Sequence, residues 1–216
     1  MTSINMEVFY MLEGIKIYWI GGSPCCGKST ISEMLVTEFG LEMYKCDDYL
    51  DKYTEIGVEN NIEIMKKFKS MNLDEIWLRD VNEQVEDEFK FYREALKIIV
   101  EDLDKNYKGK SVLIEGAVIL PEFIKNNCID NNNYICMVPT KEFQIDKYSK
   151  REWINHYLQG CSDAKKAFAN WMERDARYAE IIKKDADSYG MNVIVVDGNK
   201  SINDNYVVVK QLFGLV

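Results

Sequence analysis

Eight consecutive residues near the N-terminus have the types and spacing that a polyphosphate site requires. They fit the pattern G-x-x-x-x-G-K-[ST] and, with the residue that follows, are Gly22, Ser23, Pro24, Cys25, Cys26, Gly27, Lys28, Ser29 and Thr30. Glycines allow successive backbone N–H groups to turn toward a phosphate group. Lys28 is expected to reach the β- and γ-phosphates of a nucleotide, and the Ser29 hydroxyl to bind Mg²⁺. Residues 22–30 therefore predict a binding site for ATP and Mg²⁺.

Acidic residues follow two later apolar segments. Asp47 and Asp48 come directly after residues 41–46, and Glu115 ends the apolar run 111–114. Open α/β sheets place their chemistry at the carboxyl ends of strands. We therefore expect Glu115 and Asp47 to hold or orient Mg²⁺ together with Ser29. An alternative is that Asp47 only caps the helix after it, because Asp is a favoured N-cap residue.

These residues must be positioned by alternating strands and helices. Strands are predicted over residues 15–20, 41–46, 111–114, 134–138 and 192–196, and helices over 30–39, 74–104, 163–189 and 203–213. Asp74 and Ser162 are expected to cap the second and third of these helices. Alternation of this kind predicts an α/β fold, a parallel sheet with helices on both faces.

Length, composition and charge narrow the class of protein. The chain has 216 residues, 47% of them hydrophobic, and a formal charge of −9, so we expect one globular domain over residues 1–216. The acidic charge argues against a nucleic-acid partner, and no apolar run approaches the ~20 residues of a membrane span. The six cysteines match no zinc-binding spacing, and residues 1–14 lack the basic segment of a signal peptide, so we expect a cytoplasmic protein.

The motifs together resemble those of P-loop kinases that act on small molecules, a group that includes the adenylate, uridine, shikimate and gluconate kinases. Residues 46–49 resemble the strand-end Asp motif of uridine and nicotinamide riboside kinases, in which the first Asp is the base. Residues 171–175 resemble the arginine-bearing lid helix, and Asp197 and Gly198 resemble the turn near the adenine. The resemblance implies a three-layer sandwich with a five-stranded sheet in the order 2-3-1-4-5. It also implies a substrate-binding helical insertion over about 53–108 and a lid over about 141–178.

What the resemblance implies about function is transfer of the γ-phosphoryl group of ATP to a hydroxyl group of a small molecule, such as a nucleoside or a sugar. Asp47 would accept the hydroxyl proton with help from Asp48, and Arg174 and Arg177 would close over the γ-phosphate, with Arg151 as a further candidate. Residues 53–110 match no known substrate-binding pattern, so the acceptor and the oligomeric state stay open. Alternatives are a zeta-toxin-like kinase, a drug-modifying phosphotransferase, or a nucleotide-binding regulatory protein without catalysis.

Overall fold

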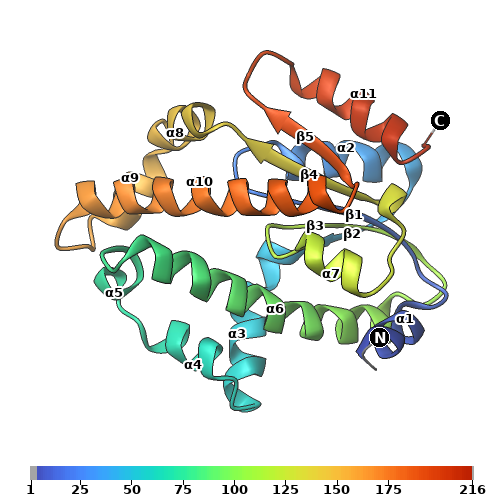
Figure 1. Ribbon diagram of the computed structural model, residues 1–216, viewed down its shortest axis with the longest axis horizontal. Coiled ribbons are helices and arrows are strands. Elements are labelled where there is room, and N and C mark those ends of the chain that lie inside the picture. The colour runs from blue at the N-terminus through green and yellow to red at the C-terminus, as the bar shows by residue number, and fades with distance from the viewer. Residues whose placement is uncertain (1–3, 216) are drawn as a thin grey trace.

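Five parallel strands form the centre of the computed structural model, which describes residues 4–215 (Figure 1). The strands are β1 (Lys16–Gly22), β2 (Glu42–Lys45), β3 (Ser111–Glu115), β4 (Tyr134–Pro139) and β5 (Asn192–Val196). Their order is β2-β3-β1-β4-β5, which confirms the predicted sheet. Because β1 is central, the loop that follows it lies at the same edge of the sheet as the carboxyl ends of β2 and β3.

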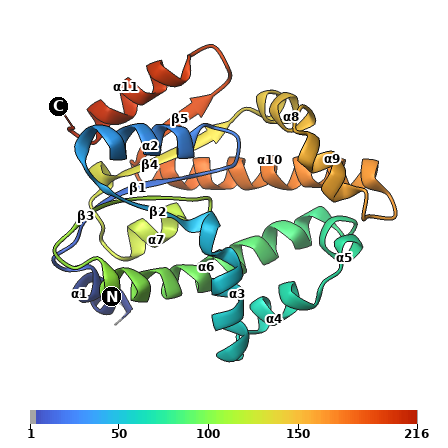
Figure 2. The same cartoon turned by 180° about the vertical axis from the view of Figure 1, so that it is seen from behind.

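Helices cover both faces of this sheet (Figures 1 and 2). One face packs against α2 (Lys28–Phe39) and α11 (Ile202–Leu212), and the other against α6 (Val81–Asn106), α7 (Pro121–Asn126) and α10 (Ala164–Ser188). Successive side chains of a strand point to opposite faces. Accordingly Ile17 and Trp19 lie in the larger core on the α6 side, whereas Tyr18 and Ile20 lie in the core on the α2 side.

The helix predicted over residues 74–104 is in fact two helices, so that prediction was wrong. A short helix, α5 (Leu73–Trp77), ends before Asp80, which caps α6 by accepting a hydrogen bond of 2.8 Å from the Asn82 backbone. The side chain of Gln84 donates to the carbonyl groups of Trp77 and Arg79 at the end of α5. The chain therefore turns here because Asp80 begins a new helix and Gln84 satisfies the end of the previous one.

Both predicted cap residues are also replaced by others. Asn72 caps α5, and the Asp74 carboxylate instead accepts a hydrogen bond from the Ser162 backbone. Asp163 caps α10 by accepting from the Lys166 backbone at 2.9 Å. The Asp74–Ser162 bond joins α5 to the start of α10, so residues far apart in the sequence meet at the end of the lid.

The remaining helices lie at the two ends of the sheet (Figure 1). One of them, α1 (Ile4–Leu12), precedes the amino end of β1, and the others, α3 (Leu50–Glu59), α4 (Glu63–Ser70), α8 (Lys141–Ser149) and α9 (Glu152–Leu158), lie toward the carboxyl ends of the strands. Short 3₁₀ turns occur at Cys46–Tyr49 and Asn131–Asn133. In the segment predicted to be a lid, Tyr148, Ile154 and Trp171 form a third hydrophobic cluster with Trp77 of α5. Within residues 4–215, no helix is both long and apolar enough to cross a membrane.

Candidate active site

The loop between β1 and α2 is shaped by close packing that only glycine permits. Gly22 has φ 129°, and a Cβ atom there would lie 1.8 Å from the carbonyl oxygen of Met137 on β4. Gly27 has φ 83°, and its Cβ would lie 2.6 Å from the side chain of Ile202 at the start of α11. A side chain at either position would therefore displace the loop from β4 or from α11. The contact with Ile202 also places the β5–α11 connection, which contains Asp197 and Gly198, beside the loop.

Lys28 lies at the first position of α2 and is almost completely buried, with 7% of its surface exposed. Its Nζ atom donates a hydrogen bond of 2.8 Å to the carbonyl oxygen of Ser23. Burial alone would lower the pKa of Lys28, but the nearby acidic groups of Cys26, Glu115 and Asp47 raise it. The lysine therefore carries its positive charge inside the loop, where a phosphate group would need it.

Glu115 ends β3 and is 2% exposed. It pairs in register with Ile20 of β1 and Lys45 of β2, which fixes it beside the phosphate loop. Burial raises the pKa of Glu115 and the charge of Asp47 adds to this, while Lys28 and a hydrogen bond from the Ser29 side chain oppose it. The sheet thus brings Glu115 next to Ser29, as the sequence predicted for two Mg²⁺ ligands.

Asp47 lies in the 3₁₀ turn directly after β2, with its side chain open to solvent. Neither this turn nor α3 has a side-chain cap, so Asp47 does not serve as a helix cap. Partial desolvation by the surrounding protein and the charge of Asp48 raise the pKa of Asp47, and Lys28 opposes them. Both residues are exposed, but Asp47 is the member of the pair whose charge acts on Lys28 and Glu115.

The predicted Mg²⁺ residues can be compared with what the ion requires. Among residues 4–215, no group of three or more His, Cys, Asp or Glu side chains is arranged to hold a metal ion. Mg²⁺, however, usually keeps several waters and binds one or two carboxylates together with phosphate oxygens of a substrate. Ser29, Asp47 and Glu115 provide only oxygen ligands and fit that kind of site.

Arg174 is held by carboxylates on the side of α10 that faces α6. Its Nε and Nη2 atoms donate to Asp175 Oδ1 at 2.9 and 2.6 Å, and Nε lies 3.5 Å from Glu88 Oε2. The guanidinium also lies over the ring of Trp77, 4.8 Å from its centre. Burial alone would lower the pKa of Arg174, but Glu88 and Asp175 raise it, so the arginine stays charged.

Arg177 lies in a different place from Arg174, although the two are three residues apart. It donates to Glu173 at 2.8 Å and to the side chain of Asn82, and it lines a hollow with Lys141 and Lys183. Arg174, in contrast, lines the pocket described below. The structure therefore does not bring the two predicted arginines into one site.

Arg151, the further candidate among the predicted arginines, differs from the other arginines in its surroundings. The other four arginines each contact a carboxylate, and these are Arg79, Arg93, Arg174 and Arg177. Within the described part of the chain, Arg151 forms no ion pair, and its guanidinium lies over the Tyr148 ring at 4.9 Å. Its positive charge acts on Cys25 in the phosphate loop, lowering the pKa of that thiol against the effect of burial. The sequence signal was its position just before α9, at the centre of the predicted lid.

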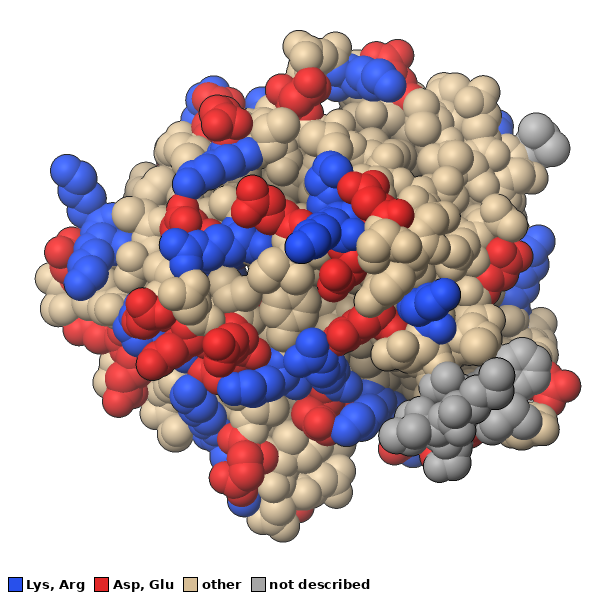
Figure 3. Space-filling model, in the orientation of Figure 1, with Lys and Arg blue, Asp and Glu red and all other residues tan. Residues whose placement is uncertain are grey.

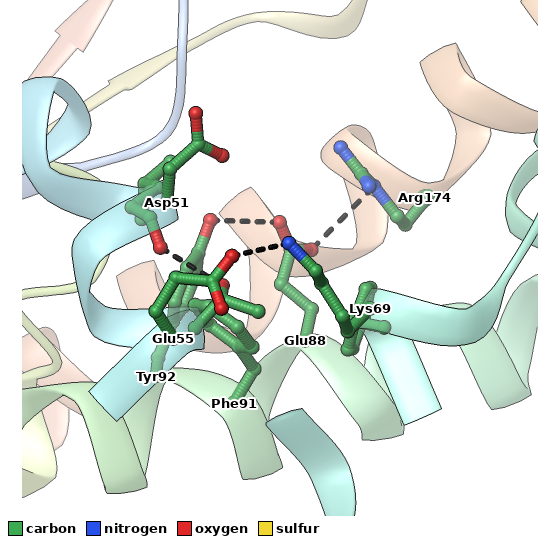
Figure 4. Close-up of a pocket in the computed structure, with 10 residues that line it drawn as sticks. Asp51, Glu55, Lys69, Glu88, Phe91, Tyr92 and Arg174 are labelled. Atoms are coloured by element: carbon green, nitrogen blue, oxygen red, sulfur yellow. Dashed lines mark hydrogen bonds and ion pairs between the residues drawn. The ribbon is translucent and has the colours of Figure 1, made fainter. Parts of the chain in front are cut away.

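A pocket of ≈ 420 Å³ lies among the helices that follow Asp47 in the chain (Figure 4). We call it the acceptor pocket, and it is lined by Leu50, Asp51, Thr54, Glu55, Phe68, Lys69, Glu88, Phe91, Tyr92 and Arg174. Its walls come from α3, α4, α6 and α10, and Leu50 follows Asp47 by three residues. The charge of Asp47 also acts on Tyr92. These residues lie mostly in the segment for which the sequence offered no substrate-binding pattern, and only the packing of four helices brings them together.

The two adjacent cysteines of the loop are not activated thiols. Burial raises the pKa of Cys25 to about 11 despite the opposing charge of Arg151. Burial also raises the pKa of Cys26, whose Sγ donates to the Ser23 and Met137 carbonyl groups. A thiol reacts as the thiolate, so these two residues fill the loop rather than carry redox chemistry.

Comparisons with known proteins show the fold. No protein-family model and no curated protein matches the chain in sequence. Among solved structures, shikimate kinase from Bacteroides thetaiotaomicron aligns with a TM-score of 0.51 and 11% identity over 93% of this chain and 99% of that chain. The protein TT1252 from Thermus thermophilus aligns with a TM-score of 0.51 and 16% identity over 94% of this chain and all of that chain. With these likenesses and its strand order, the chain has the α/β fold of P-loop proteins, as found in shikimate kinase.

Proposed function

We propose that the protein transfers the γ-phosphoryl group of ATP to a hydroxyl group of a small molecule. The observation that carries this proposal is the arrangement around Lys28. A buried ammonium group lies in the phosphate loop with Glu115 and Asp47 close enough to raise its pKa, and the charge of Asp47 also acts on Tyr92 in the wall of a pocket of small-molecule size. A non-catalytic nucleotide-binding protein would have no need of the pocket or of a carboxylate that caps no helix.

Each residue then has a role that its position supports. The loop amides and Lys28 would hold the phosphates, and Ser29 and Glu115 would hold Mg²⁺, which neutralises charge on the phosphate oxygens. Asp47 would accept the proton of the attacking hydroxyl group. A bond forms between the acceptor oxygen and the γ-phosphorus, the bond from that phosphorus to the β–γ bridging oxygen breaks, and ADP leaves. Positioning and charge stabilisation supply most of the catalysis in reactions of this type.

The arginines divide between the two substrates in this proposal. Arg174 forms part of the wall of the acceptor pocket, where Glu88 and Asp175 hold it in place. Arg151 has no such partner within the described residues and lies near the loop, so it is free to reach the transferred phosphoryl group. A cationic group placed there would stabilise the charge of the transition state. Arg177 would contribute only if the lid moved.

The test is consumption of ATP in the presence and absence of acceptors. The protein is incubated with ATP, Mg²⁺ and a panel of nucleosides, sugars, cyclitols, amino alcohols and antibiotics, and products are identified by mass spectrometry. We expect ADP to form rapidly only when the correct hydroxyl compound is present, with a product heavier by one phosphoryl group. ATP binding without transfer to any compound would instead favour the regulatory alternative.

A further inference from the structure

The acceptor pocket contains more carboxylates than free cations (Figure 4). Asp51, Glu55 and Glu88 line it, and the lining cations are Lys69 and Arg174. Lys69 is ion-paired with Glu55, so these two charges cancel locally. Arg174 is shared with the buried carboxylate of Asp175, outside the pocket lining, which leaves the pocket itself negative.

Glu88 carries part of this negative charge, and one of its two oxygens lacks a hydrogen-bond donor although it is ion-paired with Arg174. The residue is 9% exposed, and its Oε1 accepts a hydrogen bond of 2.9 Å from Tyr92. Its Oε2 accepts no hydrogen bond, although Arg174 Nε lies 3.5 Å away, because the Nε–H group donates to Asp175. A buried carboxylate oxygen without a donor destabilises a protein unless something supplies the donor. Glu88 lines the pocket, so a bound molecule can bring a donor to its carboxylate.

Asp51 provides a second carboxylate, whose charge acts on Lys69. It lies on the first turn of α3, one residue after Leu50, and its side chain is exposed toward solvent at the pocket. Within residues 4–215 it forms no ion pair with a lysine or an arginine (Figure 4). Asp51 and Glu88 therefore give the pocket one carboxylate near its opening and one at its wall.

The rest of the lining suits a cation as well. The aromatic rings of Phe68, Phe91 and Tyr92 form part of the wall, and Phe68 and Phe91 pack edge to face with ring centres 5.3 Å apart. The faces of aromatic rings attract ammonium groups, and carboxylates bind them through charge-assisted hydrogen bonds. A carboxylate-bearing acceptor would instead meet Asp51 and Glu88, with both lining cations already engaged.

We propose that the acceptor is an alcohol that also carries a protonated amine, with Glu88 and Asp51 binding its ammonium group. This inference rests on the proposed phosphotransferase function and names the chemical class of its substrate. In this arrangement the ammonium group donates to the Glu88 carboxylate, and the hydroxyl group is directed toward Asp47, whose charge acts on Tyr92 of the pocket wall. Neutral analogues would satisfy the oxygen of Glu88 without offsetting the negative charge.

The experiment compares matched compounds that differ only in charge. The three sets are glucosamine, glucose and glucuronate; tyramine, tyrosol and 4-hydroxyphenylacetate; and 2-aminoethanol, ethylene glycol and glycolate. Binding is measured by calorimetry with Mg²⁺ and a non-hydrolysable ATP analogue present, and transfer is measured with ATP. We expect the amine to bind best in at least one set, by about tenfold or more over its neutral counterpart, because hydrogen bonds to charged groups contribute that much.

Variants then assign the preference to the pocket. Glu88→Gln and Asp51→Asn should each reduce the preference for the amine by about tenfold, while Glu86→Gln, on the same helix with its side chain 70% exposed, should not. Asp51 is exposed, so its variant remains informative even if Glu88→Gln lowers stability. The inference would be overturned by any of three results. These are equal or better binding of neutral or carboxylate compounds, no binding of any amine, and a preference for the amine that is unchanged in both pocket variants. The proposed function would fail separately if no compound of any charge accepted a phosphoryl group from ATP.

Discussion

Lys28 and Ser23 lie at opposite ends of the phosphate loop and are joined by a hydrogen bond of 2.8 Å from the Lys28 Nζ atom to the Ser23 carbonyl oxygen. The Ser23 side chain in turn contacts the backbone carbonyl of Asp175 on α10 at 3.4 Å. The lysine therefore crosses the loop, and the loop is connected to the helix that carries Arg174. A phosphate group that enters the loop would replace this bond, in which only the donor is charged, with one between two charged groups, which is stronger.

The first prediction concerns this lysine. Replacing Lys28 by Ala should weaken ATP binding by about 10- to 100-fold, because a hydrogen bond between charged groups is lost. The measurement is calorimetric titration with ATP and Mg²⁺. Lys183→Ala is a suitable control, because Lys183 is an exposed residue of α10 paired with Asp187. Equal ATP affinity in Lys28→Ala and the unmodified protein would refute the assignment of the loop as a phosphate site.

The second prediction tests Asp47 as the base. Asp47→Asn should lower the rate of phosphoryl transfer by about 10²–10⁴-fold, as is typical when a general base is lost. ATP binding should be retained, because Lys28 and the loop amides that would hold the phosphates are unchanged. Single-turnover transfer and ATP titration together measure both effects. The matched control is Asp48→Asn, which should change transfer far less; the opposite ranking would assign the role to Asp48.

The third prediction concerns pH. Desolvation and Asp48 raise the pKa of Asp47, so the transfer rate should rise with pH through a value above 3.8, the ordinary value for Asp. The folded protein then binds this proton more tightly than the unfolded chain, so Asp47 lowers stability as pH rises from its unfolded pKa through its folded one. At pH 7, Asp47→Asn should therefore melt at the same or a higher temperature. A clear loss of stability at pH 7 would indicate a structural role for the carboxylate.

The fourth prediction separates structural from catalytic arginines. Arg174→Ala should destabilise the protein by about 3–5 kcal/mol, because it leaves Glu88 and Asp175 buried without a cation. For a chain of this size that corresponds to a melting temperature lower by roughly 10 °C. Thermal unfolding followed by circular dichroism measures it. Arg177→Ala, which removes a half-exposed ion pair with Glu173, should shift the midpoint by only about a degree.

The fifth prediction concerns Arg151. Arg151→Ala should leave the melting temperature nearly unchanged, because no ion pair is lost within the described residues. It should lower kcat more than it raises KM for ATP, because the contact would form mainly in the transition state. Steady-state kinetics with the identified acceptor decide this, with Lys150→Ala as the neighbouring control. If kcat is unchanged in Arg151→Ala, the cation that stabilises the transferred group must be sought elsewhere.

The distribution of surface charge bears on the prediction that the protein has no nucleic-acid partner. On the face shown in Figure 3, lysine and arginine side chains alternate with aspartate and glutamate, matching the many ion pairs along α6 and α10. With a formal charge of −9, the prediction of no nucleic-acid partner can be checked by titration with labelled DNA and RNA at low salt. Binding that weakens steeply with added salt would contradict it.

Much of the fold could be predicted from the sequence, because its signals are local. The glycines and Lys28 mark the phosphate loop, and alternating apolar segments predict a parallel sheet. The positions of Asp47 and Glu115 after strands predict that they share an edge with the loop. The break between α5 and α6 was missed, because Asp80 and Gln84 act on chain ends that periodicity alone does not reveal.

The acceptor pocket and the ion-pair partners of the arginines depended on tertiary structure. Arg174 and Arg177 are three residues apart on one helix, but Arg174 forms an ion pair with Glu88 and Arg177 forms one with Glu173. Glu88, Asp51 and Phe68 come from three helices whose relative packing no local pattern specifies. The sequence by itself thus determined the candidate phosphate site, since a loop, its glycines and its lysine are contiguous. Only the tertiary structure decided which side chains surround the acceptor pocket. The charge balance of the pocket is the sum of side chains that are distant along the chain and are brought together by core packing.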